Sequence, residues 1–175
     1  MPEDKRNALV LGIDPGLNVT GYGVIEAVGN KLKLREAGVI RSKRSDSLEA
    51  RLLELHEGLA DILADCHPTA MAVEQLYSHY ERPRTAILMG HARGVLCLAA
   101  AQAGIPLEHY AATQVKKTLT GNGRASKDQV QLAICREFGL AKPPEPNDVA
   151  DALAVALCHI HFGCRLSNDI AASIR

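Results

Sequence analysis

Residues 8–40 read ALVLGIDPGLNVTGYGVIEAVGNKLKLREAGVI and contain three strand patterns in direct succession. The first, residues 8–14, is a short apolar run that stops at Asp-Pro-Gly, which is a turn signal. The second and third, residues 20–28 and 31–40, are separated by a Gly-Asn pair, which favours a tight hairpin. We therefore predict that an antiparallel meander of three strands opens the fold.

The patterns that follow alternate between helix and strand. Leucines and isoleucines recur at spacings of three and four from about Ser47 to Pro68, which predicts a helix with one apolar face, with Asp46 and Glu49 as its capping box. Further along, we predict a strand at residues 69–74, a helix at about 84–103, a strand at 105–109, a helix that stops at the Gly-Asn-Gly loop 121–123, a helix that begins at Ser126 with Gln129 as its capping partner, and a last helix over about 149–160.

The order of these elements, βββαβαβααα, predicts the fold class. Strands that are joined through helices lie parallel, by the right-handed crossover rule, and helices then cover both faces of the sheet. We expect an α/β fold with a five-stranded mixed sheet, an antiparallel meander followed by parallel strands. The first and fourth strands should be neighbours at its centre, pointing the same way.

Length and composition exclude several classes of protein. A chain of 175 residues that is 47% hydrophobic and 23% charged is typical of one globular domain, and not of a disordered or fibrous chain. No apolar run approaches the roughly 20 residues of a membrane helix, and the first residues lack a secretory signal. Five cysteines without framework spacing favour a reducing compartment. We expect a single cytoplasmic domain over residues 1–175, with short flexible tails at about 1–7 and 164–175 and no membrane partner.

Charge is balanced overall but unevenly distributed. Twenty basic residues meet twenty acidic ones, which excludes a globally basic protein. Residues 31–44 nevertheless carry six basic residues against one acid, and residues 81–136 carry eight against three. Acidic residues dominate residues 49–65 instead. A locally basic surface for nucleic acid is therefore compatible with zero net charge.

Four acidic residues occupy distinctive positions. Asp14 ends the first predicted strand and Glu74 ends the fourth, and the carboxyl ends of neighbouring parallel strands are where α/β folds bind ligands. Asp148 and Asp151 lie three apart at the start of the last helix, hence on one helical face. Such carboxylates suit Mg²⁺, and two ions about 3.5–4 Å apart could clamp a phosphodiester. Each residue alone is also compatible with a turn, an exposed strand end or a helix cap.

At these residues the chain resembles the RuvC family of bacterial Holliday junction resolvases. The similarity extends from residue 8 to about 162 and rests on LGIDPGLNVTGYGVIE, AVEQLY, YAATQVKKTLTGNGRASKDQV and NDVADALAVALCH. It implies a ribonuclease-H-like fold and a homodimer that resolves four-way DNA junctions by paired symmetric nicks in homologous recombination and DNA repair. It further implies two Mg²⁺ ions per subunit, replaceable by Mn²⁺, and RuvA and RuvB as partners.

The resemblance also implies roles for single residues. The catalytic and metal-binding acids would be Asp14, Glu74, Asp148 and Asp151. The DNA-binding residues would be Lys116, Lys127, Tyr77, Lys117 and Arg124. Tyr77 stands where the family has an aromatic residue near the junction crossover, for which Phe is typical. The position of Lys127 supports a phosphate contact independently of the resemblance. A lysine in the first turn of a helix is unfavourable beside the positive end of the helix dipole unless an anion binds there.

Alternatives from other classes remain. LGIDPG also resembles the first phosphate loop of actin-like ATPases and sugar kinases, but 175 residues are too few for their two lobes. A nuclease of the ribosomal RNA precursor type lacks the long match over residues 113–130. A non-catalytic junction-binding module would not need four acids. For the homodimer, the helix at about 84–103 carries more apolar surface than one face requires.

Overall fold

A computed structural model describes residues 7–75 and 83–173 of the chain. Its single sheet has the order β3-β2-β1-β4-β5, with antiparallel pairing through the meander and parallel pairing of β1 with β4 and of β4 with β5. The strands are β1 (Asn7–Asp14), β2 (Val19–Val28), β3 (Lys31–Arg41), β4 (Ala70–Glu74) and β5 (Leu107–Tyr110). The predicted five-stranded mixed sheet, with the first and fourth strands adjacent, is confirmed.

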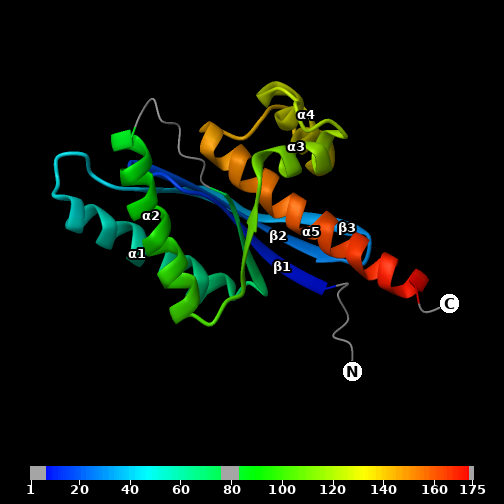
Figure 1. Ribbon diagram of the computed structural model, residues 1–175, viewed down its shortest axis with the longest axis horizontal. Helices are drawn as coiled ribbons and strands as arrows, with labels where there is room; N and C mark the ends of the chain where they lie inside the picture. Colours follow the sequence, from blue (N-terminus) through cyan, green and yellow to red (C-terminus); the bar gives the residue numbers. More distant parts are fainter. Residues whose placement is uncertain (1–6, 76–82, 174–175) are drawn as a thin grey trace.

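Helices cover both faces of this sheet, as predicted. Figure 1 shows α5 lying along one face with α3 and α4 near its beginning, while α1 and α2 lie on the other. The helices are α1 (Leu48–Cys66), α2 (Pro83–Gln102), α3 (Ala112–Thr120), α4 (Lys127–Phe138) and α5 (Asn147–Ser173). The element order βββαβαβααα is therefore the observed one.

The core consists of two apolar layers, one on each side of the sheet. Neighbouring residues of β1 point to opposite faces, so Val10 belongs to the layer under α5 whereas Leu11 belongs to the layer under α1 and α2. Both side chains are almost fully buried. This explains why the central strand is a continuous apolar run, whereas a strand with one exposed face would alternate.

Two glycines allow α5 to approach the sheet closely. A Cβ added at Gly12 would collide with the backbone carbonyl of Ala152, and one added at Gly21 would collide with that of Asp148. Gly21 is also the strand partner of Asp14 across β1 and β2. The absence of a side chain at Gly21 therefore places the start of α5 beside the end of β1.

The helix ends differ from expectation in two places. The predicted capping box of Asp46 and Glu49 is wrong, because α1 begins one residue later and Ser47 caps it by accepting a hydrogen bond from the Ala50 amide at 3.4 Å. The capping box of Ser126 and Gln129 is confirmed at the start of α4. The backbone of α5 continues as a helix to Ser173, into the segment assigned to a tail, and no proline interrupts it there.

None of the helices in the described part of the chain combines the length and the apolar character that a membrane span requires.

Candidate active site

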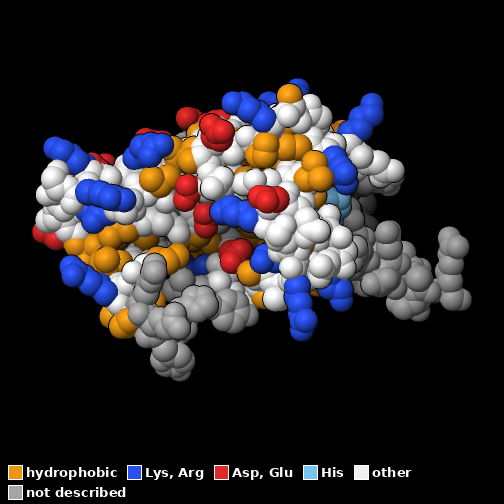
Figure 2. Space-filling view, turned by 90° about the horizontal axis from the view of Figure 1, so that it is seen from above, with side chains coloured by type: hydrophobic (Ala, Val, Ile, Leu, Met, Phe, Trp, Pro, Cys, Tyr) orange, Lys and Arg blue, Asp and Glu red, His pale blue; other side chains and the backbone are white. Residues whose placement is uncertain are grey.

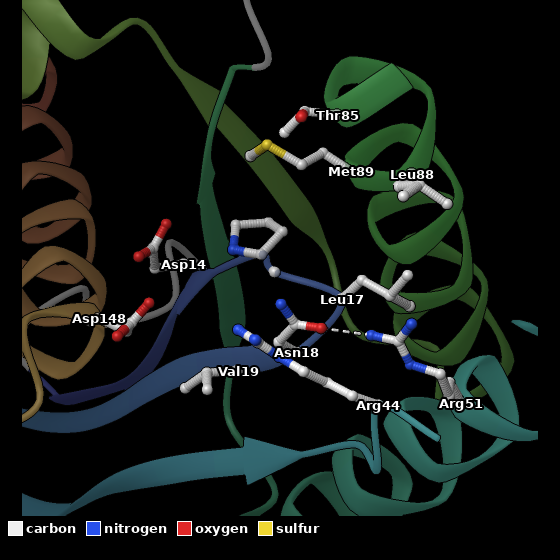
Figure 3. Close-up of a pocket in the computed structure, with 12 residues that line it drawn as sticks. Asp14, Leu17, Asn18, Val19, Arg44, Arg51, Thr85, Leu88, Met89 and Asp148 are labelled. Atoms are coloured by element: carbon white, nitrogen blue, oxygen red, sulfur yellow. Dashed lines mark hydrogen bonds between the residues drawn. The ribbon is translucent and has the colours of Figure 1, made fainter. Parts of the chain in front are cut away.

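The four acidic residues named from the sequence meet at the carboxyl ends of the central strands β1 and β4. Asp14 and Glu74 are the last residues of β1 and β4, which pair in parallel through Ile13 and Val73. Asp148 and Asp151 lie in the first turns of α5, which packs across β1 and β2. Figure 3 shows the Asp14 and Asp148 side chains next to each other at these strand ends.

Electrostatics confirm that the acids act on one another. The pKa of Asp14 is raised to about 7, first by burial and then by the negative charges of Asp151, Asp148 and Glu74. The pKa of Glu74 is also raised, by burial and by the charge of Asp151. Burial and the neighbouring negative charges therefore disfavour the ionised forms of Asp14 and Glu74. A nearby positive charge would relieve this cost.

Lys127 provides part of that charge. Its Nζ donates a hydrogen bond to Asp151 Oδ2 at 2.8 Å, and its charge lowers the pKa of Asp14. In this structure the anion beside Lys127 in the first helical turn is a side chain of the protein itself, and the predicted phosphate contact of Lys127 stays a prediction. The hydrogen bond from Lys127 occupies Asp151 Oδ2, one of the carboxylate oxygens available to a metal ion.

The donor set nevertheless fits a hard divalent cation. All four side chains offer carboxylate oxygens, the ligands that Mg²⁺ prefers, and their mutual repulsion is what such an ion would neutralise. Within residues 7–75 and 83–173, no three His, Cys, Asp or Glu side chains lie close enough together to hold a metal ion as they stand. The chemistry of the site thus matches Mg²⁺, with the carboxylates arranged around the ends of β1 and β4.

An arginine that was not predicted from the sequence holds the backbone of Glu74. Arg93, in α2, donates from Nη1 to the Glu74 carbonyl oxygen, and its Nη2 contacts His109 Nδ1 on β5. Gln75, directly after β4, donates its amide to the carbonyl of Tyr110 at 2.8 Å. The end of β4 is therefore tied to α2 and β5. The signal in the sequence that could have identified Arg93 is one arginine among the mainly apolar residues 86–101 of this helix.

The predicted DNA-binding residues divide into three groups. Lys116 lies near the acids, because its charge lowers the pKa of Glu74, and Lys127 contacts Asp151 directly. Lys117 and Arg124 are exposed, at the end of α3 and in the loop before α4, and no contact joins them to the acids. Tyr77 lies outside the described residues, so its role stays a prediction.

A groove leads away from the acids and contains residues that the sequence did not single out. It has a volume of about 550 Å³ and begins at Asp14 and Asp148. Figure 3 shows it passing between the turn after β1 and helix α2 toward Arg44 and Arg51. Figure 2, seen from above Figure 1, shows acidic side chains near the middle of this face with Lys and Arg side chains on both sides.

The chain is similar to known proteins that share one family description. Residues 10–159 match the model of the family described as crossover junction endodeoxyribonuclease RuvC. A protein of that name from Rhodopirellula baltica is 63% identical over 149 residues, covering 85% of this chain and 84% of the relative. One from Desulforamulus reducens is 46% identical over 162 residues, covering 93% of this chain and 99% of the relative.

Solved structures with the same fold include two resolvases. The structure titled T. thermophilus RuvC in complex with Holliday junction substrate superimposes with a TM-score of 0.84 at 34% identity, covering 89% of this chain and 94% of that one. The yeast mitochondrial Holliday junction resolvase superimposes with a TM-score of 0.66 at 14% identity, covering 91% and 80%, which shows a shared fold.

Proposed function

Because the chain belongs to the RuvC family of crossover junction endodeoxyribonucleases, we propose that Asp14, Glu74, Asp148 and Asp151 are the acids with which it cuts four-way DNA junctions. It is a nuclease of homologous recombination and DNA repair, and the match over residues 10–159 sets it apart from the ribosomal RNA precursor type. The observation that supports the four acids is their convergence at the ends of two adjacent parallel strands.

Nucleases of this family depend on metal ions, and we propose two Mg²⁺ ions per subunit, replaceable by Mn²⁺. Asp14, Glu74, Asp148 and Asp151 would hold them. When bound, such ions neutralise the phosphate oxygens and lower the pKa of the attacking water. Asp14 is the central acid of the set, because it responds to the charges of the other three.

The basic residues would act on the substrate. Lys116, near Glu74, would stabilise the negative charge that develops on the phosphate. Lys127 is placed to exchange its hydrogen bond with Asp151 for one to a DNA phosphate, beside the start of α4. Lys117 and Arg124 would contact the DNA backbone further out, and Tyr77 would stack near the junction crossover.

Paired cuts require two active sites related by a two-fold axis, which a homodimer supplies. Helix α2 supports this assembly because Ile87 and Leu98 are 62% and 52% exposed on the described surface of one subunit. We also propose RuvA and RuvB as partners and the cytoplasm as the location, the latter because the five cysteines lack a disulfide framework.

A cleavage assay on a synthetic junction that cannot branch-migrate tests this function. With Mg²⁺ or Mn²⁺ the wild-type protein should nick two opposite strands at symmetric positions, whereas with a chelator it should bind the junction without cutting it. Equal cutting of linear duplex DNA, or undiminished cutting in chelator, would show that the proposed function is wrong.

A further inference from the structure

The groove beside the acids ends in two arginines and an asparagine that have no assigned role. We propose that Arg44 and Asn18 bind a phosphate of the cleaved DNA strand, close to the phosphate that is cut. This proposal rests on the proposed function, since it assumes that the scissile phosphate lies at Asp14 and Asp148. It adds a binding site on the opposite side of the acids from Lys116 and Lys127.

The shape of the groove suits a strand of nucleic acid. Residues 15–18, in the turn between β1 and β2, form one wall, and Leu88 and Met89 of α2 form an apolar wall opposite (Figure 3). Its volume is about 550 Å³. Because Asp14 and Asp148 line the same groove, a strand held at the acids can continue directly into it.

The guanidinium of Arg51 is hydrogen-bonded within the protein and orders the residues around it. Its Nε donates to Ser42 Oγ at 3.2 Å, and its Nη2 donates to Asn18 Oδ1. Ser42 Oγ in turn donates to the carbonyl of Leu17. These bonds hold the turn after Asp14 in place and fix the orientation of the Asn18 amide.

The fixed orientation leaves the Asn18 amide nitrogen without a hydrogen bond to any described residue. Since Asn18 Oδ1 accepts from Arg51, its amide nitrogen is the group left to bond elsewhere. Figure 3 shows this nitrogen on the side of the amide that faces away from Arg51, in the groove. Asn18 is exposed, so a ligand can reach it.

Arg44 supplies the positive charge. Its guanidinium forms no ion pair or hydrogen bond with any other described residue, and Figure 3 shows its side chain extending past Asn18 toward the side of Asp148. The lysine that pairs with one of the four acids is Lys127, which bonds to Asp151 at 2.8 Å, so Arg44 is not that partner. A guanidinium and an amide N–H that share one wall are a suitable pair of donors for a phosphodiester.

The next residue along the chain offers a matched control. Lys43 carries the same charge, but it pairs with Asp46 at 3.8 Å, its side chain is 74% exposed, and it does not line the groove. Arg44→Gln and Lys43→Gln each remove one positive charge from the same loop. A difference in junction affinity between the two variants therefore comes from a contact in the groove, because both variants change the net charge of the protein equally.

The first measurement is junction binding in chelator as a function of salt. Arg44→Gln should weaken binding about tenfold and lower the salt slope by about 0.9, the values for one lost phosphate contact. Lys43→Gln should change affinity about twofold or less. Asn18→Asp keeps the acceptor for Arg51, so it should remain folded and yet weaken binding by repelling the phosphate.

The second measurement locates the phosphate. Junctions that each carry one uncharged methylphosphonate are bound to the wild type and to Arg44→Gln. One position close to the cut should weaken the wild type and leave Arg44→Gln unaffected. If both proteins respond alike at every position, or if Arg44→Gln behaves as Lys43→Gln does, the inference is wrong. The scan measures binding, so it tests the Arg44 contact even if the wild type does not cut. A wild type that binds but does not cut would overturn the proposed function and not the Arg44 contact.

Discussion

Lys127 Nζ lies 2.8 Å from Asp151 Oδ2, so a proposed DNA-binding cation is paired with a proposed metal ligand. The pair joins the first residue of α4 to the first turns of α5. It balances part of the charge of the acids, and the hydrogen bond to Asp151, followed by the charge of Asp151, raises the pKa of Lys127. A metal ion bound at Asp151 would therefore compete with Lys127 for the same carboxylate.

Removal of Lys127 should strengthen metal binding while it weakens cleavage. In Lys127→Met, Asp151 loses its partner and the site becomes more negative, so Mn²⁺ should bind about two- to fivefold more tightly, as for a half-exposed ion pair. Titration calorimetry without DNA measures this, with Lys117→Met as control because Lys117 is exposed and makes no contact with the acids. Weaker metal binding in Lys127→Met than in Lys117→Met would contradict the competition.

Asp14 should make the metal-free protein less stable as the pH rises. The folded protein keeps the Asp14 proton up to about pH 7, whereas the unfolded chain releases it near pH 3.8, so the free energy of unfolding falls across this window. Asp14→Asn removes the effect. The free energy of unfolding of Asp14→Asn should equal that of the wild type near pH 4. Toward pH 7 it should exceed the wild-type value by a growing amount, at most roughly 4 kcal/mol.

Urea unfolding at several pH values in chelator measures that difference. Saturating Mg²⁺ should shrink it, because a bound cation stabilises the ionised form of Asp14. An advantage that is constant from pH 4 to pH 8 would show that burial and the neighbouring acids do not raise the pKa of Asp14.

Arg93 should affect the cleavage rate more than the affinity for DNA. Its hydrogen bond to the Glu74 carbonyl fixes the end of β4, and a displacement of about 1 Å can cost about a hundredfold in rate. Arg93→Ala should therefore lower single-turnover cleavage by about 10- to 100-fold with junction affinity nearly unchanged. Arg84→Ala, an exposed residue of the same helix, is the control. Equal losses of rate and affinity in Arg93→Ala would point to a DNA contact.

Gly21 should tolerate no side chain. An added Cβ would collide with the backbone of Asp148, so Gly21→Ala should displace the start of α5, destabilise the protein by about 1–3 kcal/mol and abolish most cleavage. Gly38→Ala meets only the movable ring of Tyr22 and should cost less. Thermal unfolding of both variants measures the difference. If Gly38→Ala proves the more damaging of the two, the close packing of α5 on β2 is not what positions Asp148.

The sequence predicted the sheet and the four acids because both depend on local patterns. Short apolar strand patterns, one hairpin signal and the crossover rule are enough to place Asp14 beside Glu74. Contacts between distant segments leave no such pattern. The bonds from Arg93 to Glu74 and from Arg51 to Asn18 join residues 19 and 33 positions apart, and only tertiary packing brings them together. The cap of α1 was misplaced by one residue because Asp46 and Ser47 both suit that position.

The central claim is that the acids at the ends of β1 and β4 cut the junction. Its most direct test is single-turnover cleavage of a fixed junction by Asp14→Asn with Mg²⁺ present, with binding measured in parallel. We expect the variant to bind as the wild type does, since basic residues dominate affinity, and to cut at least about a hundredfold more slowly. Cleavage at the wild-type rate by Asp14→Asn would contradict the account.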